Sequence, residues 1–354
     1  MNPTAVHKHT VMVVGGGVTG LGTALALDEL GIETLILEKA PAMGGKVKDY
    51  DKIFPNFVSG RDIVNELIAR VERAPGITFR TDTVISGLAE TKAGYAVSMN
   101  NEQRVEVSAI VLASGFEVFD ARLQEEYGYG VYPNVINGPE LELYLDPHGP
   151  SGGRLLRPFD GKPARRVAII FCVGSRSKRL GNPYCSRICC TYSTKQAIEI
   201  MERDPGASVT CFYMDIRTYG RGFEEMYQYA QDLGVKYIRG RVSECSVLPE
   251  GDIQVRAENT LLGRPVQGVF DLVSLSVGMM PCADAARLAD QLCIERGKDG
   301  FFGGVDQYLA PHDTRREGIF LAGSVTGLKP IHDCLNEALS VAGRVAAYLN
   351  HHTG

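Results

Sequence analysis

Four of the nine cysteines lie within one stretch of 19 residues, at Cys172, Cys185, Cys189 and Cys190, with the spacing C-x12-C-x3-C-C. Four thiolates can complete the coordination of a zinc ion or of an iron–sulfur cluster. Zinc sites usually use two C-x2–4-C pairs, and the adjacent Cys189 and Cys190 would have difficulty in placing both sulfurs on one small tetrahedral ion. A cubane cluster, which presents separate corners, accepts an adjacent pair more easily. The stretch therefore indicates an iron–sulfur site, and a set of buried thiols packed beneath a helix is the alternative.

A glycine-rich turn near the N-terminus forms the second chemical pattern. A β-branched run over 10–14 leads into Gly15-Gly16-Gly17-Val18-Thr19-Gly20, which opens an apolar helix over 21–30, and a second strand over 32–37 ends at Glu38. Glycines at the first, third and sixth positions allow a tight turn and let a pyrophosphate approach the helix N-terminus. Glu38 can hold ribose hydroxyls. The spacing predicts a dinucleotide-binding βαβ unit.

Several later segments indicate that the dinucleotide is FAD. Gly44-Gly45-Lys46 lets the backbone turn sharply, as in flavoproteins with two dinucleotide-binding domains, and Ala113-Ser114-Gly115 resembles the segment that closes their FAD domain. A strand that ends at 323–324 leads into the final helix, whose N-terminus can place positive charge at the flavin. The complete predicted cofactor-binding set is Gly15, Gly16, Gly17, Val18, Thr19, Gly20, Glu38, Lys39, Gly44, Gly45, Lys46, Val84, Ala113, Ser114, Gly115, Gly278, Gly323, Ser324, Pro330 and Ile331.

Length and composition restrict the class of protein. The chain has 354 residues, 44% hydrophobic residues and 40 glycines, which suits a large core and about two domains. A net charge of −5 and only short basic runs argue against nucleic acid as a partner. No apolar run approaches the length of a membrane span, and residues 1–10 lack an export signal, so we expect a cytoplasmic protein with no membrane insertion. Clustered cysteines in odd number favour reduced thiols or metal over disulfides.

A second α/β pattern begins at 165. Strands over 166–172, 209–214 and 235–239 alternate with helices over 191–203 and 223–233, and further strands follow at 253–257 and 272–277. The predicted fold is therefore an α/β flavoprotein with two dinucleotide-binding domains, similar to thioredoxin and glutathione reductases. We expect an FAD-binding Rossmann domain over 1–160 and 279–354, with an inserted Rossmann-like domain over 161–278. A segment over 116–163, rich in Gly, Pro and Tyr, is predicted to connect the two as a packed loop or a subunit contact.

The cysteine stretch also carries a family resemblance. The runs Phe171-Cys172-Val173-Gly174-Ser175-Arg176 and Asn182-Pro183-Tyr184-Cys185-Ser186-Arg187-Ile188-Cys189-Cys190, followed by 195–197, 215–217 and 222–225, resemble the A-type subunit of heterodisulfide reductase, which is its flavoprotein subunit. The resemblance implies that Cys172, Cys185, Cys189 and Cys190 bind a [4Fe–4S] cluster close to FAD. It also implies a homodimer within a larger assembly that contains subunits B and C.

One departure from the longer family members bears on the function. This chain lacks their additional ferredoxin-type motifs, since the other five cysteines stand alone at Cys211, Cys245, Cys282, Cys293 and Cys334. It is therefore similar to the short form found in the heterodisulfide-reductase-like complexes of sulfur-oxidising bacteria. We expect an oxidoreductase subunit that exchanges electrons between flavin, cluster and partner subunits in sulfur or disulfide metabolism, with no acid–base catalytic residue.

Two other functions stay open. The first is a stand-alone NAD(P)H-dependent disulfide reductase, which is disfavoured because the second domain has no glycine-rich phosphate loop after its first strand, where Cys172-Val173-Gly174-Ser175 stands instead. The 38–46 region also lacks the C-x4-C of such reductases. The second is a zinc-stabilised flavoprotein scaffold, in which the four cysteines are structural.

Overall fold

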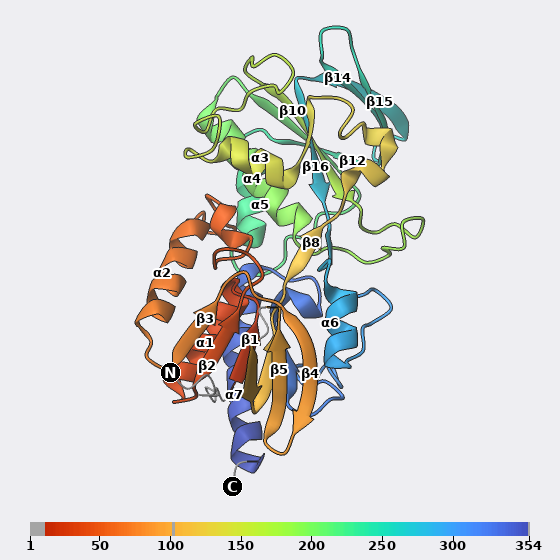
Figure 1. The fold of residues 1–354 in the computed structure, drawn as a ribbon. Coiled ribbons are helices and arrows are strands. Elements are labelled where there is room, and N and C mark those ends of the chain that lie inside the picture. The colour runs from red at the N-terminus through yellow and green to blue at the C-terminus, as the bar shows by residue number, and fades with distance from the viewer. Residues whose placement is uncertain (1–10, 101–102, 353–354) are drawn as a thin grey trace. The chain divides into compact units, whose positions relative to one another are not determined.

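The computed structural model describes residues 11–100 and 103–352, so Thr10, the first residue of the predicted first strand, lies outside the described residues (Figure 1). The chain divides into two compact units. The first contains the described residues of 1–48, 61–117 and 280–354, and the second contains 49–60 and 118–279. Among the described helices, none combines the length and the apolar character needed to cross a membrane.

A five-stranded parallel sheet forms the centre of the first unit. Its order is β18 (Ile319–Leu321), β7 (Ala109–Leu112), β1 (Val11–Val14), β2 (Thr34–Leu37) and β3 (Ile77–Arg80). The strands are short and almost wholly apolar because both faces of the sheet are covered. β1, which leads into the glycine-rich turn, therefore lies in the middle of the sheet.

Helices cover one face of this sheet, and a small antiparallel sheet with one helix covers the other. On the first face, α1 (Val18–Glu29), α2 (Gly60–Arg73) and α7 (Ile331–His352) share a core that includes Val13, Leu21, Val71 and Val341 (Figure 1). On the second face lie β4 (Ile85–Thr91), β5 (Gly94–Met99), β6 (Arg104–Val107) and α6 (Ala285–Leu292). The predicted βαβ pattern at the N-terminus thus has the packing that such a unit needs.

The second unit has its own five-stranded parallel sheet. Its order is β12 (Lys236–Arg239), β11 (Ser208–Tyr213), β10 (Arg166–Val173), β16 (Leu272–Val277) and β9 (Val135–Asn137). The helices are α3 (Gly138–Leu145), α4 (Cys189–Arg203) and α5 (Phe223–Asp232), and an antiparallel sheet contains β13 (Val242–Val247), β14 (Ile253–Asn259) and β15 (Arg264–Phe270). β8 (Phe116–Val118) pairs with β17 (Met279–Pro281) where the chain passes from one unit to the other.

The boundaries of the units differ from the expected 1–160, 161–278 and 279–354. Residues 118–160 belong to the second unit because β9 extends its sheet, with Val135 opposite Val273, and α3 follows directly. Residues 49–60 also belong to it, and Phe54 packs edge-on against Phe223 with ring centroids 5.9 Å apart. The sequence could not predict either segment, because a strand of three residues such as β9 and a short loop such as 49–60 are too short to show a periodic pattern.

Buried charges hold residues 49–60 to the helices of the second unit. Lys195, on α4, is 1% exposed. Its ammonium donates to the Lys52 carbonyl at 3.0 Å, pairs with Glu142 on α3, and lies 3.1 Å from Glu199 one turn along α4. Both carboxylates are buried as well. Buried charges of this kind stabilise the fold only as a set. If one partner is removed, the other remains a buried charge that has lost its water and has no opposite charge beside it.

Lys195→Met should therefore destabilise the protein strongly. The substitution leaves two buried carboxylates without their shared cation, and we expect the free energy of unfolding to fall by about 3–5 kcal/mol. Guanidinium denaturation followed by circular dichroism measures the change. Lys162→Met is the control, because the Lys162 side chain is 74% exposed and pairs with Asp160 at the surface, so its loss should cost less than about 1 kcal/mol. Equal losses in the two variants would contradict this prediction.

Candidate cofactor sites

The glycine-rich turn lies where the central strands of the first unit end. The backbone at Gly15 has φ +118°, and a Cβ added there would lie 2.4 Å from the Ala113 carbonyl oxygen at the end of β7. A Cβ added at Gly20 would lie 1.8 Å from the Gly15 carbonyl oxygen. Side chains at these two positions would push the turn away from the strand ends. The turn thus has the close backbone packing that a phosphate-binding βα turn requires.

Glu38 and the Gly44-Gly45 pair lie against this turn. One Glu38 carboxylate oxygen accepts a hydrogen bond from the Gly16 amide at 2.7 Å, and the other accepts from the Ala40 amide at 2.8 Å. The Gly44 amide donates to the Gly16 carbonyl at 2.8 Å, and a Cβ added at Gly45 would lie 3.0 Å from the Gly17 Cα. The structure therefore brings together the three sequence segments that were predicted to form one cofactor site.

Further predicted residues lie at the same edge of the sheet, because parallel strands end on the same side. Ala113 follows β7 and donates its amide to the Val14 carbonyl, and Ser114 follows it. Gly323 follows β18, and a Cβ added there would lie 2.3 Å from the Thr19 hydroxyl on α1. These contacts place 18–20, 113–115 and 323–324 around one turn.

Other predicted residues are arranged differently. Lys39 and Lys46 are ion-paired, with Asp284 at 3.0 Å and Glu117 at 2.8 Å, so their charges are compensated within the unit. Val84 precedes β4 and exchanges hydrogen bonds with Asn100. Ile331 begins α7 directly after Pro330. None of these contacts tests a role in cofactor binding, which stays a prediction.

Gly278 belongs to the second unit, beside the cysteine stretch. Its amide donates to the Val173 carbonyl at 2.8 Å, and its carbonyl accepts from the Phe119 amide at 2.9 Å. A Cβ added at Gly278 would lie 2.5 Å from the Ser186 hydroxyl, which accepts a hydrogen bond from the Met279 amide. The glycine is therefore needed for close packing between β16 and the cysteine loop. A role for Gly278 toward the cofactor of the first unit stays a prediction.

The four cysteines are positioned by β10, α4 and the loop between them. Cys172 lies near the end of β10, at a shift in the register between β10 and β16, and its φ is +62°. Cys189 and Cys190 are the first two residues of α4, which therefore begins before the predicted helix start at Thr191. Cys185 lies in the loop, where the Arg187 amide donates to its sulfur at 3.4 Å. Strand end, loop and helix start thus each supply candidate ligands.

Backbone strain gathers at this stretch. Six non-glycine residues of the described chain have positive φ, and three of them are Cys172, Arg176 and Arg187. Such conformations cost on the order of 1–3 kcal/mol each and persist where surrounding structure holds them. Here the Gly174 amide donates to the buried Gln124 side chain at 2.7 Å, and Asn182 donates back to the Gly174 carbonyl at 3.0 Å. The loop is therefore held by its neighbours in an unfavourable backbone shape.

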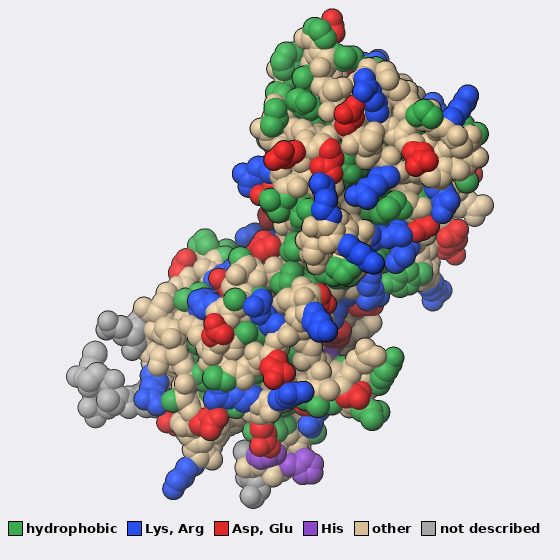
Figure 2. All heavy atoms as spheres, turned by 90° about the vertical axis from the view of Figure 1, so that its right-hand side faces the viewer, with side chains coloured by type: hydrophobic (Ala, Val, Ile, Leu, Met, Phe, Trp, Pro, Cys, Tyr) green, Lys and Arg blue, Asp and Glu red, His purple; other side chains and the backbone are tan. Residues whose placement is uncertain are grey.

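The surroundings of the thiols lower the pKa of Cys172 and Cys190 and raise that of Cys189. A hydrogen bond with Cys189, helped by the charges of Arg176 and Arg217, lowers the pKa of Cys172 to about 7. The hydrogen bonds of Cys189 with Cys172 and Cys190 raise the pKa of Cys189, while the bond with Cys189 lowers the pKa of Cys190. The first turn of α4 has no acidic residue and no side-chain cap, so its free amides add positive potential. Figure 2 shows many Lys and Arg side chains on this unit.

The donor set fits an anionic metal–thiolate group. Within the described residues, Ser175 Oγ and Arg176 Nη1 are buried side-chain donors in the cysteine loop that have no hydrogen-bond partner. Buried donors are usually satisfied, and sulfur atoms of a bound cluster would be acceptors for both. Cysteines 172, 185, 189 and 190 would hold such a cluster, which would supply one-electron chemistry. In the first unit, the glycine turn and Glu38 likewise fit a dinucleotide, and FAD bound there would supply the flavin.

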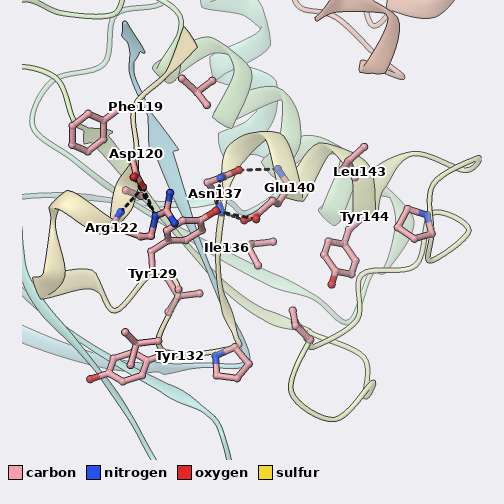
Figure 3. Close-up of a pocket in the computed structure, with 18 residues that line it drawn as sticks. Phe119, Asp120, Arg122, Tyr129, Tyr132, Ile136, Asn137, Glu140, Leu143 and Tyr144 are labelled. Carbon is pink, nitrogen blue, oxygen red and sulfur yellow. Dashed lines mark hydrogen bonds and ion pairs between the residues drawn. The ribbon is translucent and has the colours of Figure 1, made fainter. Parts of the chain in front are cut away.

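Residues 116–163 line a pocket in the second unit (Figure 3). It has a volume of about 800 Å³ and contains Tyr129, Tyr132 and Tyr144. The Tyr129 hydroxyl donates to Glu140 at 2.9 Å and accepts from Asn137 at the same distance, and both partners belong to the capping box of α3. These polar groups satisfy one another, so local packing accounts for Tyr129. A subunit contact at this segment stays a prediction.

Two residues of the cysteine site could not be assigned from residue type and spacing alone. Gln124 comes from the Gly, Pro and Tyr-rich segment, and no pattern there indicates a contact with Gly174. Asp215 follows β11, and its carboxylate accepts from Arg176 at 2.7 Å while its carbonyl lies 3.6 Å from the Cys190 sulfur. The signal for Asp215 is its place two residues after β11, a largely buried strand that pairs with β10, the strand that contains Cys172.

The low pKa of Cys172 can be measured in metal-free protein. The thiol should ionise near pH 7 instead of 9.0, so ultraviolet thiolate absorbance should show an early step that Cys172→Ser removes. Because the pKa is lower in the folded chain, the ionisation should stabilise the fold as pH rises from 7 toward 9, and this contribution should disappear as pH falls through 7. Cys211→Ser is the control, since burial raises the pKa of Cys211 above this range. A step that survives in Cys172→Ser would contradict the assignment.

Comparison with known proteins agrees with this geometry. Residues 2–131 match the pyridine nucleotide-disulphide oxidoreductase family. The fold resembles thioredoxin reductase of T. acidophilum, with a TM-score of 0.67, 17% identity and coverage of 97% of this chain and 99% of that one. The expected α/β flavoprotein fold is thereby confirmed. The likeness at this identity concerns the fold alone.

The relatives found by sequence have a higher sequence identity to this chain than that structure has. The chain is 34% identical to a CoB–CoM heterodisulfide reductase iron-sulfur subunit of the A type from Methanopyrus kandleri, over 96% of this chain and 64% of that protein. It is 35% identical to the corresponding protein of Methanocaldococcus jannaschii, over 95% of this chain and 63% of that protein. The chain thus spans a little under two thirds of the length of these relatives, whose names are those of oxidoreductases. As the cysteine stretch predicted, this chain is a homologue of the A-type subunit of heterodisulfide reductase over nearly its entire length.

Proposed function

We propose that the protein is an FAD- and [4Fe–4S]-containing electron-transfer subunit of an oxidoreductase complex. The observation that supports it most is the convergence of Cys172, Cys189 and Cys190 at a strained strand end and an uncapped helix start, beside buried donors without partners. The residues of this chain would bind and orient the two cofactors and place positive charge near the thiolates. The bound cofactors would supply the redox chemistry.

The positions of the sulfurs bear on the choice between a cluster and a single zinc ion. In a tetrahedral zinc site with Zn–S bonds of about 2.3 Å, the sulfurs lie about 3.8 Å apart. Within the described residues, the only group of three or more ligand atoms that all lie within 4.8 Å of one another is Asp51, Asp146 and His148. No three of the four cysteine sulfurs meet this condition, although Cys189 is hydrogen-bonded to both Cys172 and Cys190. The zinc-scaffold alternative is therefore decided by metal analysis.

No observation favours the NAD(P)H-dependent reductase. The nucleotide site of such an enzyme would need a short glycine turn between the first strand and helix of the second unit. Here β10 ends at Val173 and α4 begins at Cys189, and the cysteine loop fills the interval. The loop is folded on itself by the backbones of Ser177 and Asn182, which exchange hydrogen bonds across it.

The assembly is proposed from the relatives. Since they are A-type subunits of heterodisulfide reductases, we infer that this chain works with partner subunits equivalent to B and C, as a homodimer in the cytoplasm. We further propose that the complex is of the heterodisulfide-reductase-like type that acts in sulfur oxidation. Copurification of the native complex, with mass spectrometry of the subunits, tests this part separately from the cofactors.

Cofactor analysis of anaerobically purified protein tests the central proposal. We expect flavin and iron–sulfur absorbance together, with about four irons and four sulfides per FAD. Zinc without iron and sulfide would favour the scaffold. Flavin alone, without metal, would overturn the proposal, and rapid bleaching of the flavin by NADH alone would revive the reductase.

Separate variants should remove the two cofactors independently. Cys189→Ala and Cys190→Ala should each lose most of the iron and keep FAD, because the glycine turn is in the other unit. Gly20→Val should lose FAD, because even a Cβ there would overlap the Gly15 carbonyl, and it should keep the iron. Cys245→Ala is the matched control, since Cys245 is a buried cysteine of β13 outside the stretch. Full iron content in both α4 variants would exclude these cysteines as ligands.

A further inference from the structure

Arg176 has a fixed position in the cysteine loop. Its backbone is left-handed, with φ +55°, and its amide donates to the Tyr184 carbonyl at 2.7 Å. At the other end of the side chain, Nη2 donates to the Asp215 carboxylate at 2.7 Å. Asp215 follows β11, the strand next to β10. The guanidinium is thus anchored from two sides, and its orientation is set by the fold.

One terminal nitrogen of this guanidinium, Nη1, is buried. Within the described residues no acceptor lies in hydrogen-bond geometry for Nη1, while the charge of Arg176 and a side-chain hydrogen bond from its guanidinium to Cys172 lower the pKa of that thiol. Asp215, whose carboxylate accepts the hydrogen bond from Nη2, also has its backbone carbonyl oxygen 3.6 Å from the Cys190 sulfur. Arg176 therefore lies beside Cys172, and its partner Asp215 lies beside Cys190.

A charged donor at this position has a defined effect on a metal–thiolate cluster. Reduction adds one electron to the cluster and makes it more negative, so a fixed positive charge and an N–H···S hydrogen bond stabilise the reduced form more than the oxidised one. Arginine stays protonated throughout, so Arg176 itself neither releases nor takes up a proton when the electron arrives. The expected consequence is a higher reduction potential.

We propose that Arg176 is a positioning residue that raises the reduction potential of the cluster bound by Cys172, Cys185, Cys189 and Cys190, by donating Nη1–H to a cluster or cysteine sulfur. This inference rests on the proposed function, because it requires an iron–sulfur cluster at these cysteines. It goes further by assigning the control of the potential to one side chain that is not itself a ligand.

The test compares Arg176→Gln and Arg176→Lys with the unsubstituted protein. Iron per FAD is measured first, and the midpoint potential of the cluster is then determined by dithionite titration, one electron per cluster, followed by electron paramagnetic resonance. We expect about four irons in each protein, because the ligands are unchanged, and a lower midpoint in Arg176→Gln. Arg176→Lys should show a smaller shift in the same direction, since a single ammonium cannot serve Asp215 and the sulfur in the fork geometry of arginine.

Arg179→Gln is the matched control. It lies three residues along the same loop, but its side chain is 67% exposed and pairs with Glu126 at 2.9 Å. Its midpoint should equal that of the unsubstituted protein, whereas a general loosening of the loop would move all three variants alike.

The outcomes separate the two proposals. An unsubstituted protein without iron would overturn the proposed function, and this inference with it. Iron-loaded variants with unchanged midpoints would overturn the inference and leave the function standing. If Arg176→Gln loses its iron, the midpoint of Arg176→Lys decides: a lowered value supports the inference, and an unchanged value overturns it.

Discussion

The carboxyl ends of parallel strands lie at one edge of a sheet, and both candidate sites depend on this constraint. In the first unit, β1, β2, β7 and β18 deliver the glycine turn, Glu38, Ala113 and Gly323 to the same edge. In the second unit, β10 and β11 deliver Cys172 and Asp215 in the same way. Residues far apart in the sequence meet there because parallel strands in register all end on the same side of the sheet.

The two edges differ in the residues that they carry. In the first unit the turn after β1 is tight and made of glycine, so that backbone amides can approach a pyrophosphate. In the second unit the corresponding turn is a folded loop that carries cysteine and arginine, and three residues of this stretch hold left-handed backbone conformations. A chain with a net charge of −5 nevertheless surrounds its thiols with arginine and a helix N-terminus. That local positive charge suits thiolates.

The second unit also depends on buried ionic contacts. α4 begins at two cysteines and further along carries Lys195, whose ammonium binds Glu142, Glu199 and the backbone of 49–60. The helix that supplies half of the thiols is therefore fixed by segments from three parts of the sequence. Such fixation keeps ligand positions constant while the charge of a bound group changes, which is what electron transfer without large rearrangement requires.

The sequence by itself determined the features that rest on local spacing. The glycine turn, Glu38, the four-cysteine stretch and the alternating strands and helices of both units follow from short-range patterns, because each is encoded within one βα segment. Only the tertiary structure decided what depends on long-range pairing. Residues 118–160 join the second sheet through the three-residue β9, residues 49–60 dock on α4, and Gly278 packs against the cysteine loop. The position of the Arg176 guanidinium beside Cys172 likewise depends on Asp215, which comes from another strand end.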